Sequence, residues 1–171
     1  MPRLHSITKL SKVILMCSAL TATTGLSQYQ IGADIEGEAA GDRFGKAVPL
    51  SADGNRLAIG APFNDRNGNS AGQVRVYDWN GSAWIQAGAV IEGEAAGDRS
   101  GKAVALSADG NRLAIGEWGD DSKGSDTGNV RVFDWNGSAW VKVGSDIIGE
   151  AAGDRFIDIS VFLTDLLANN G

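Results

Sequence analysis

The chain has 171 residues, 24 of them glycine, with 43% hydrophobic residues, 21% charged residues and a formal net charge of −6. This length fits one domain, and the composition is typical of a turn-rich globular protein rather than a disordered chain. The acidic balance argues against nucleic acid as a partner, because phosphate backbones are bound by basic surfaces.

The N-terminal segment, residues 1–27, differs in composition from the rest of the chain. Arg3, Lys9 and Lys12 precede the apolar run VILMCSAL and the small, hydroxyl-rich stretch TATTGLS, with no acidic residue among them. This order predicts a secretory signal peptide over residues 1–27, and hence a secreted or cell-surface protein. A membrane anchor is the alternative, but the apolar run is far shorter than the roughly 20 residues of a spanning helix.

Removal of this segment would change the chemistry of the chain, because it holds the only cysteine, Cys17, and the only histidine, His5. The mature chain would keep 12 basic and 21 acidic residues, a net charge of −9. Disulfides, Ser-His and Cys-His catalysis and the usual zinc sites are then excluded. We therefore expect a non-catalytic protein. No cofactor is expected, and no membrane span is expected in the mature chain.

A long repeat fills most of the remaining sequence. The motif IEGEAAGDR begins at Ile35 and at Ile91, and IIGEAAGDR begins at Ile147, at equal spacing. Residues 35–90 and 91–146 are identical at 38 positions without a gap, and a partial third unit spans residues 147–156. A period of this length, rich in short strands and turn signals, predicts a propeller or an array rather than a helical solenoid.

Each unit is predicted to contain four short strands, which in the first unit lie near residues 46–51, 56–60, 73–79 and 83–87. The turn ADGN joins the first two strands and Asn80-Gly81 joins the last two, and both sequences favour tight hairpins. Pro49 falls in the first strand, where it is tolerated only at a sheet edge. An innermost strand beside a propeller channel is such an edge.

Both faces of the predicted sheet are apolar. A two-residue turn between the last two strands would place Tyr77 opposite Trp84, on the face that also carries Trp79. The opposite face would carry Val74, Val76 and Ile85. Two apolar faces are expected of a sheet that packs between neighbours. Four strands per unit in such a stack predict an all-β fold made of β-propeller blades.

The first unit resembles the FG-GAP repeat, the blade unit of integrin α-subunit propellers and of many secreted proteins. Phe44-Gly45, the alternating KAVPL, and LAIGAP ending at Pro62 carry the likeness. The resemblance covers about residues 32–156 and implies an incomplete propeller with a binding or adhesion role. A purely structural repeat array without a ligand of its own is an alternative. The stretch LSADGNRLAIG also resembles a WD-repeat strand pair, which implies the same architecture.

The second unit departs from the motif. It keeps Gly101, KAVAL and LAIG, but it has Ser100 in place of the phenylalanine and Glu117-Trp118 in place of Ala-Pro. The likeness is therefore specific for the first unit and degenerate in the second.

Members of the integrin-type family bind calcium in several blades, in the loop between the Phe-Gly strand and the Gly-Ala-Pro strand. Here that loop is reduced to residues 51–56, with Asp53 as its one carboxylate. Calcium takes six to eight oxygens at about 2.3–2.6 Å, more than this loop supplies. We therefore interpret Asp53, and Asp109 in the second unit, as turn-forming residues, and calcium is disfavoured as a cofactor.

The segment between the second and third strands differs most between the units, since ten of the 18 differences fall between residues 61 and 73. Functional variation on a rigid scaffold usually lies in loops. Residues 61–73 and 117–129 are therefore the expected contacts for a protein or glycan ligand. The candidate side chains are Asn64, Asp65, Asn67, Asn69, Asp120, Asp121 and Asp126. Solvated turns are the alternative, and Lys123 at the position of Asn67 argues against a shared metal site.

Two further motifs have a plain structural interpretation. GEAAGDR holds Glu38 and Asp42, which could act as acid and base in a propeller segment of a secreted hydrolase. Repetition in every unit, however, is expected of a blade connector and not of one catalytic centre. Asn80 and Asn136 match the N-glycosylation acceptor, and each coincides with a predicted hairpin turn.

Two full units are too few for a closed propeller, which has four to eight blades. After Phe156 the repeat gives way to a divergent apolar tail, residues 157–171. Three explanations stay open: a fragment of a longer propeller, self-association, or a tail that covers an exposed blade face. The first is favoured, because the break falls inside the motif.

Overall fold

The computed structural model describes residues 30–121 and 123–153 of the chain. The predicted signal peptide and the apolar tail lie outside these residues. The described part consists of strands, turns and loops, with no helix, and so it holds no helix able to cross a membrane. The predicted all-β fold class is confirmed.

The first unit forms one antiparallel sheet. Its central strand is β2 (Gln73–Trp79), which pairs with β1 (Arg56–Ala61) along one side. The other side of β2 pairs with two short strands, β3 (Trp84–Gln86) and β4 (Ile91–Glu92).

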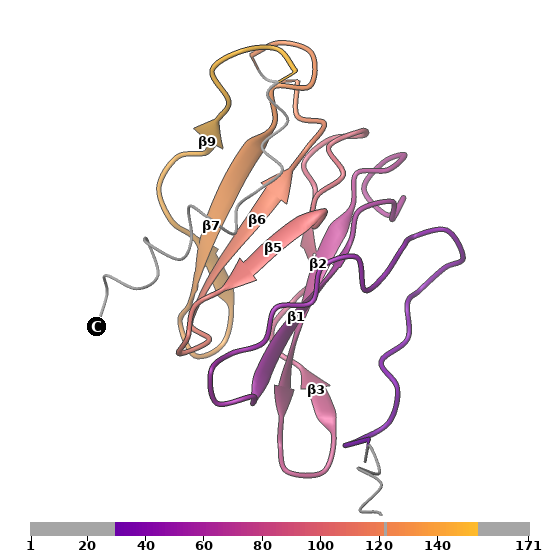
Figure 1. The fold of residues 1–171 in the computed structure, drawn as a ribbon, viewed down its shortest axis with the longest axis vertical. Helices are drawn as coiled ribbons and strands as arrows, with labels where there is room; N and C mark the ends of the chain where they lie inside the picture. Colours follow the sequence, from indigo (N-terminus) through magenta and orange to yellow (C-terminus); the bar gives the residue numbers. More distant parts are fainter. Residues whose placement is uncertain (1–29, 122, 154–171) are drawn as a thin grey trace, which may run out of the picture.

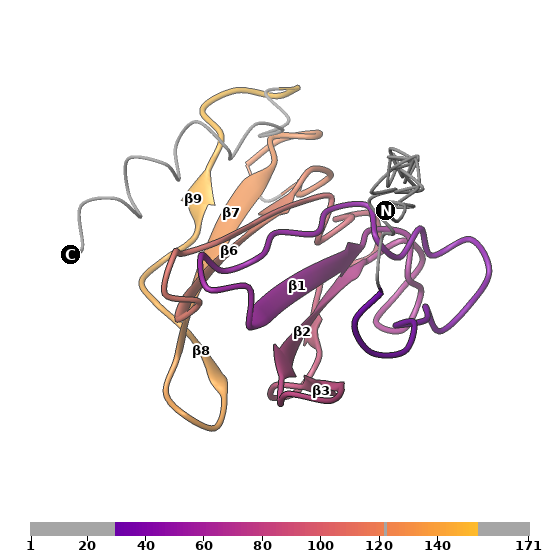
Figure 2. The ribbon, with the colours of Figure 1, turned by 60° about the horizontal axis from the view of Figure 1, so that its bottom comes forward.

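The second unit repeats this sheet and adds an inner strand. Its strands are β5 (Ala103–Leu106), β6 (Arg112–Glu117), β7 (Asn129–Trp135), β8 (Trp140–Lys142) and β9 (Ile147–Ile148). The order is β5-β6-β7-β8, and β9 pairs with β7 beside β8. The two sheets lie side by side as adjacent blades (Figure 1; Figure 2). The fold is therefore that of consecutive blades of an incomplete propeller.

The main hydrophobic core lies between the two sheets. Small and branched side chains of the first sheet, among them Ala58 and Val76, pack against Leu113 and Ile115 of the second. The face of the first sheet that points away from the second sheet is also covered. Leu57, Ile59 and Tyr77 of the first sheet are covered by Ile35 and Phe44 of its own connector. Because each sheet has two apolar faces, neither blade can bury both without a neighbour.

The hairpin between β2 and β3 is longer than the sequence predicts. Trp79, and not Tyr77, pairs with Trp84, so four residues connect the strands. The cause is Asn80, whose side-chain oxygen accepts hydrogen bonds from the N–H groups of Ser82 and Ala83 and closes a wider loop. A register shift of two residues keeps every side chain on its predicted face.

The predicted first strand of the first unit is reduced to a single bridge between Leu50 and Leu57. Its counterpart in the second unit is the full strand β5. Pro49 accounts for the difference, because proline has no N–H to donate where Ala105 of β5 has one. The carbonyl of Pro49 still accepts a bond from Ala58, 3.1 Å away, so the segment follows β1 without a complete ladder.

Candidate functional site

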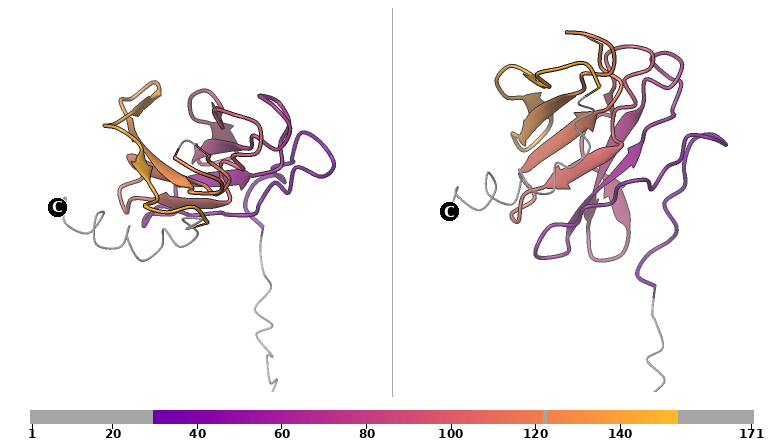
Figure 3. Two further views of the ribbon diagram at one scale, coloured as in Figure 1. Left: turned by 90° about the horizontal axis from the view of Figure 1, so that it is seen from above. Right: turned by 45° about the horizontal axis from the view of Figure 1, so that its top comes forward.

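The two variable loops, residues 61–73 and 117–129, lie at the same end of their sheets. Each follows the equivalent strand, β1 or β6, and leads into the central strand of its blade. In Figure 1 both are at the upper end of the sheets, away from the β2–β3 hairpin, and Figure 3 shows this end from above. The connector between the blades joins them, since Gly97 N–H donates to the carbonyl of Asn69 and Gly119 N–H donates to that of Asp98.

Three of the four candidate side chains of the first variable loop make hydrogen bonds that position the loop. The amide of Asn64 is buried and donates to Asp42 Oδ2 at 2.7 Å. Asp65 accepts from the N–H of Ser70, and Asn67 donates to the carbonyl of Gly93. Asn69 is exposed. Of the four predicted residues in this loop, Asn64 is therefore an internal tie and not a surface contact.

The second variable loop repeats part of this scheme. Asp121 is exposed and accepts from the N–H of Asp126, just as Asp65 does from Ser70. Asp126 takes the position of Ser70 and, like it, has a positive φ. Asp120 takes the position of Asn64, but a carboxylate cannot donate the hydrogen bond that Asn64 makes. This one replacement changes what lies beneath the loop.

A pair of linked replacements surrounds the buried arginine of each blade. In the first blade Arg75 lies over the ring of Phe44, with 4.3 Å from its Cζ to the ring centroid. In the second blade Ser100 stands at the position of Phe44, and Glu117 stands at the position of Ala61. Arg131, the counterpart of Arg75, now makes an ion pair with Glu117. A buried carboxylate has thus taken over the contact that an aromatic ring makes in the first blade.

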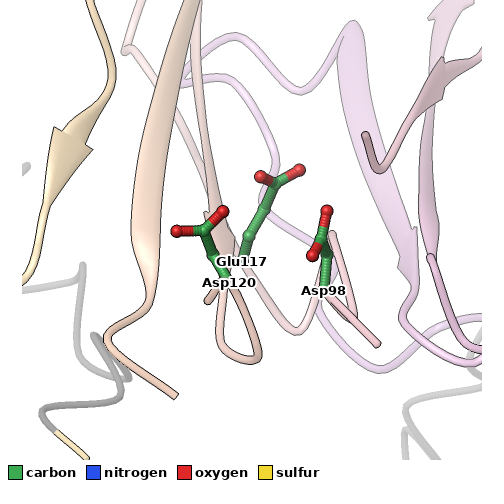
Figure 4. Close-up of side chains that lie close together, drawn as sticks. All are labelled: Asp98, Glu117 and Asp120. Atoms are coloured by element: carbon green, nitrogen blue, oxygen red, sulfur yellow. The ribbon is translucent and has the colours of Figure 1, made fainter. Parts of the chain in front are cut away.

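Three carboxylates meet at this place in the second blade. Asp98 comes from the connector before β5, Glu117 ends β6, and Asp120 belongs to the second variable loop (Figure 4). One oxygen of each lies within 4.8 Å of the others. Asp98 and Glu117 are buried, and Asp120 is partly exposed. We call these three residues the acidic cluster.

The electrostatics of the cluster are set by burial. Burial raises the pKa of Glu117, against the opposing effects of Arg131 and Ser100. Burial likewise raises the pKa of Asp98, and the nearby carboxylate of Asp120 adds to the rise. The N–H of Ala95 donates to Asp98 at 2.7 Å and partly offsets this. Burial therefore disfavours the charged forms of Asp98 and Glu117.

Sequence reasoning missed Asp98, Glu117 and Arg131. Asp98 belongs to the repeated GEAAGDR motif, which predicts a connector, and Glu117 stands where the Ala-Pro motif is lost. The available signal was the alignment of the two units, which places a carboxylate at the end of β6 where the first unit has alanine. Only the fold shows that Asp98 and Asp120 lie beside it.

The short turns hold their aspartates in local hydrogen bonds. Asp53 accepts from the hydroxyl of Ser51 and from the N–H and amide of Asn55, and these bonds lower its pKa to about 2. Asp109 makes the equivalent bonds to Ser107 and Asn111. These are the contacts of turn-forming residues.

The carboxylates considered for hydrolysis are also engaged. Asp42 is buried beneath Asn64, and Glu38 lies 3.8 Å from Arg75 and accepts from Gln73 at 3.3 Å. The two sequon residues, Asn80 and Asn136, are exposed at the hairpins at the opposite end of the blades.

Comparison with known proteins identifies the repeat. A sequence model of the family described as FG-GAP repeat matches residues 36–77 and again residues 89–133. Together the two segments cover half of the chain, and each contains the whole of β1 or β6 and most of the central strand, β2 or β7. A search of curated proteins finds no match to the chain.

Proposed function

The chain belongs to the FG-GAP repeat family, and on that premise we propose that it is a secreted or cell-surface, non-catalytic binding module. The variable loops would contact a protein or glycan ligand in an adhesive role. The composition of residues 1–27 supports export, and the absence of histidine and cysteine from the rest of the sequence supports a module without acid–base or thiol chemistry.

One observation carries this proposal. The two variable loops lie at one end of the blades and differ at ten positions, whereas the sheets beneath them are nearly identical in sequence. A rigid scaffold that presents differing loops is the usual arrangement of a binding surface. The side chains left exposed for a partner there include Asp65, Asn69 and Asp121.

Loop replacement tests the proposal. The chain without residues 1–27 would be applied to arrays of glycans and of extracellular-matrix proteins, beside a variant with residues 118–127 replaced by a Gly-Ser loop. We expect binding that the loop variant loses. A control with Ser82→Ala and Ser138→Ala, at the opposite end, should bind as the wild type does. Absence of binding, or binding that survives loop replacement, would contradict the proposal.

The outward faces of the two blades support a second part of the proposal. Leu50 on one side and Ile147 on the other are exposed apolar side chains whose counterparts, Leu106 and Ile91, are buried between the blades. Val48 is exposed as well, and its counterpart Val104 packs against the same core. Further blades of a longer chain, or a second copy of this one, would cover them. Sedimentation velocity tests the second copy, because self-association gives an assembly that grows with concentration, whereas a monomer at every concentration leaves further blades or the apolar tail of residues 157–171 as the cover.

A further inference from the structure

The starting point is one unpaired oxygen in the acidic cluster. Glu117 is 0% exposed, and its Oε1 accepts from Arg131, but its Oε2 has no hydrogen-bond partner among the described residues. Its carboxylate lies between those of Asp98 and Asp120 (Figure 4). A buried acceptor without a partner is costly, and such groups in folded proteins usually face a water or an ion.

The first blade shows what this place looks like without the cluster. There Asp42 takes the position of Asp98 and accepts a 2.7 Å hydrogen bond from Asn64. The second blade has two acceptors, Asp98 and Asp120, where the first has an acceptor and a donor. Two facing carboxylates repel each other unless a proton or a cation lies between them.

One buried cation, Arg131, contacts the acidic cluster directly. Arg131 is buried and pairs with Glu117, and it also donates to Ser100 at 3.3 Å and to the carbonyl of Glu92 at 2.8 Å. Lys102 and Arg99 approach from the adjoining segment and lie over the ring of Trp118. Arg131 thus approaches Glu117 from its Oε1 side, and Oε2 is the oxygen that has no hydrogen-bond partner among the described residues.

The separation of the carboxylates suits one ion. Their nearest oxygens lie within 4.8 Å of one another, and two oxygens bound to one Ca²⁺ at 2.3–2.6 Å are at most about 5 Å apart. Ca²⁺ accepts irregular geometry and completes its shell with water. Asp120 is partly exposed, which gives such an ion a route from solvent.

We propose that Asp98, Glu117 and Asp120 form a binding site for a divalent cation with oxygen ligands, Ca²⁺ in particular, present in the second blade and absent from the first. The site is separate from the tight turn of residues 107–112, whose Asp109 is held by Ser107 and Asn111. It does not depend on the proposed protein or glycan ligand.

Calorimetric titration with CaCl₂ tests the site on the chain without residues 1–27, after EDTA treatment and dialysis at pH 7.5. We expect one site per chain. Asp120→Asn, which restores the residue of the first blade, should weaken binding by about tenfold or more, the loss that follows removal of even an outer-shell partner. The matched control is Asp121→Asn, the same change one residue on, which should bind within about twofold of wild type, because this carboxylate lies outside the cluster.

Thermal unfolding distinguishes loss of a cation ligand from misfolding of the Asp120→Asn variant. Without cation, Asp120→Asn should unfold at the same temperature as the wild type or higher, because a repulsion has been removed. With Ca²⁺, the wild type should gain stability and Asp120→Asn should gain little. MgCl₂ and MnCl₂ titrations identify the preferred ion. If Mg²⁺ or Mn²⁺ binds more tightly than Ca²⁺, the divalent-cation site is supported and the assignment to Ca²⁺ is wrong.

Several results would overturn the inference. No heat and no thermal shift with any of the three cations would do so. Equal binding by wild type and Asp120→Asn would do so as well, as would equal loss in Asp121→Asn.

Discussion

Equivalent apolar positions of the two units are buried where they lie between the blades and exposed where they lie on an outward face. Leu106 on the inner strand of the second blade is 9% exposed and belongs to the core between the sheets, whereas its counterpart Leu50 is 55% exposed. On the opposite face Ile91 is 8% exposed beneath the second blade, and its counterpart Ile147 is 48% exposed. At these two positions burial therefore comes from the neighbouring blade, whereas the face of the first sheet that carries Leu57 and Ile59 is covered by its own unit.

The arginines at the start of β1 and β6 show the same difference. Both pair with an aspartate of the central strand, Arg56 with Asp78 and Arg112 with Asp134. Arg56 also donates to the carbonyl of Gly110 and lies over two tryptophan rings of the second blade. Within residues 30–121 and 123–153, no ring lies over Arg112. A blade contact thus adds hydrogen-bonded and aromatic partners as well as apolar burial.

The largest expected effect concerns the buried arginines. Arg131→Ala would leave the carboxylate of Glu117 buried without its cation, a loss of about 3–5 kcal/mol in the free energy of unfolding. Arg75→Ala removes a hydrogen bond to the carbonyl of Glu36 and the contact with Phe44, which should cost about 1–3 kcal/mol. Urea unfolding of both variants measures the difference, and equal losses would contradict the linked replacements described above.

The next effect concerns the leucines of the inner strands. Leu106→Ala should lower the free energy of unfolding by about 2–5 kcal/mol, because it opens a cavity between the blades. Leu50→Ala removes the same atoms from an exposed position and should stay within about 0.5 kcal/mol of wild type. Urea unfolding of monomeric protein at low concentration is the measurement. A large loss for Leu50 would mean that its face is covered.

A smaller effect concerns the pH dependence of the second blade. Asp98 has a raised pKa in the fold, above the unfolded value of about 3.9. An acid whose pKa is raised by folding binds more protons in the folded state than in the unfolded state. Its contribution to the free energy of unfolding is therefore fully present below pH 4 and is lost as the pH rises through the folded pKa. Asp98→Asn removes this loss. In EDTA, the urea concentration at the unfolding midpoint of Asp98→Asn should rise relative to that of the wild type between pH 4.5 and pH 8. A difference between the two midpoints that does not change with pH would contradict the raised pKa of Asp98.

The sequence predicts the blade well because the alternation of apolar residues and the turn residues are repeated in both units. Alternation fixed the faces of β2 and β3, so Trp79 and Trp84 share a side as expected, although Asn80 widened the hairpin. Pro49 marked an edge, and the structure shows how far it weakens the inner strand. Each of these features is local, and local chemistry is what a single sequence records.

The candidate site was harder to predict because it is made by contacts between distant segments. Asp98 and Glu117 are 19 positions apart, and nothing along the chain says that they meet. The sequence marks Asp120 as one loop carboxylate among several, without its partners. The useful clue was a difference between the repeats, Ala61 against Glu117, at a place where the framework is otherwise copied.

The stacking of the two blades is tested most directly by hydrogen exchange at the tryptophan indoles. Trp140 Nε1 donates to the carbonyl of Ala87 across the blade contact, at 3.1 Å. The equivalent bond, from Trp84 to Ile31, is absent from the described part of the chain. Nuclear magnetic resonance should therefore find the Trp140 indole proton protected, the Trp84 proton exchanging faster, and an Overhauser contact between Arg56 and Trp135. Equal exchange at the two indoles, with no such contact, would contradict the stacked arrangement.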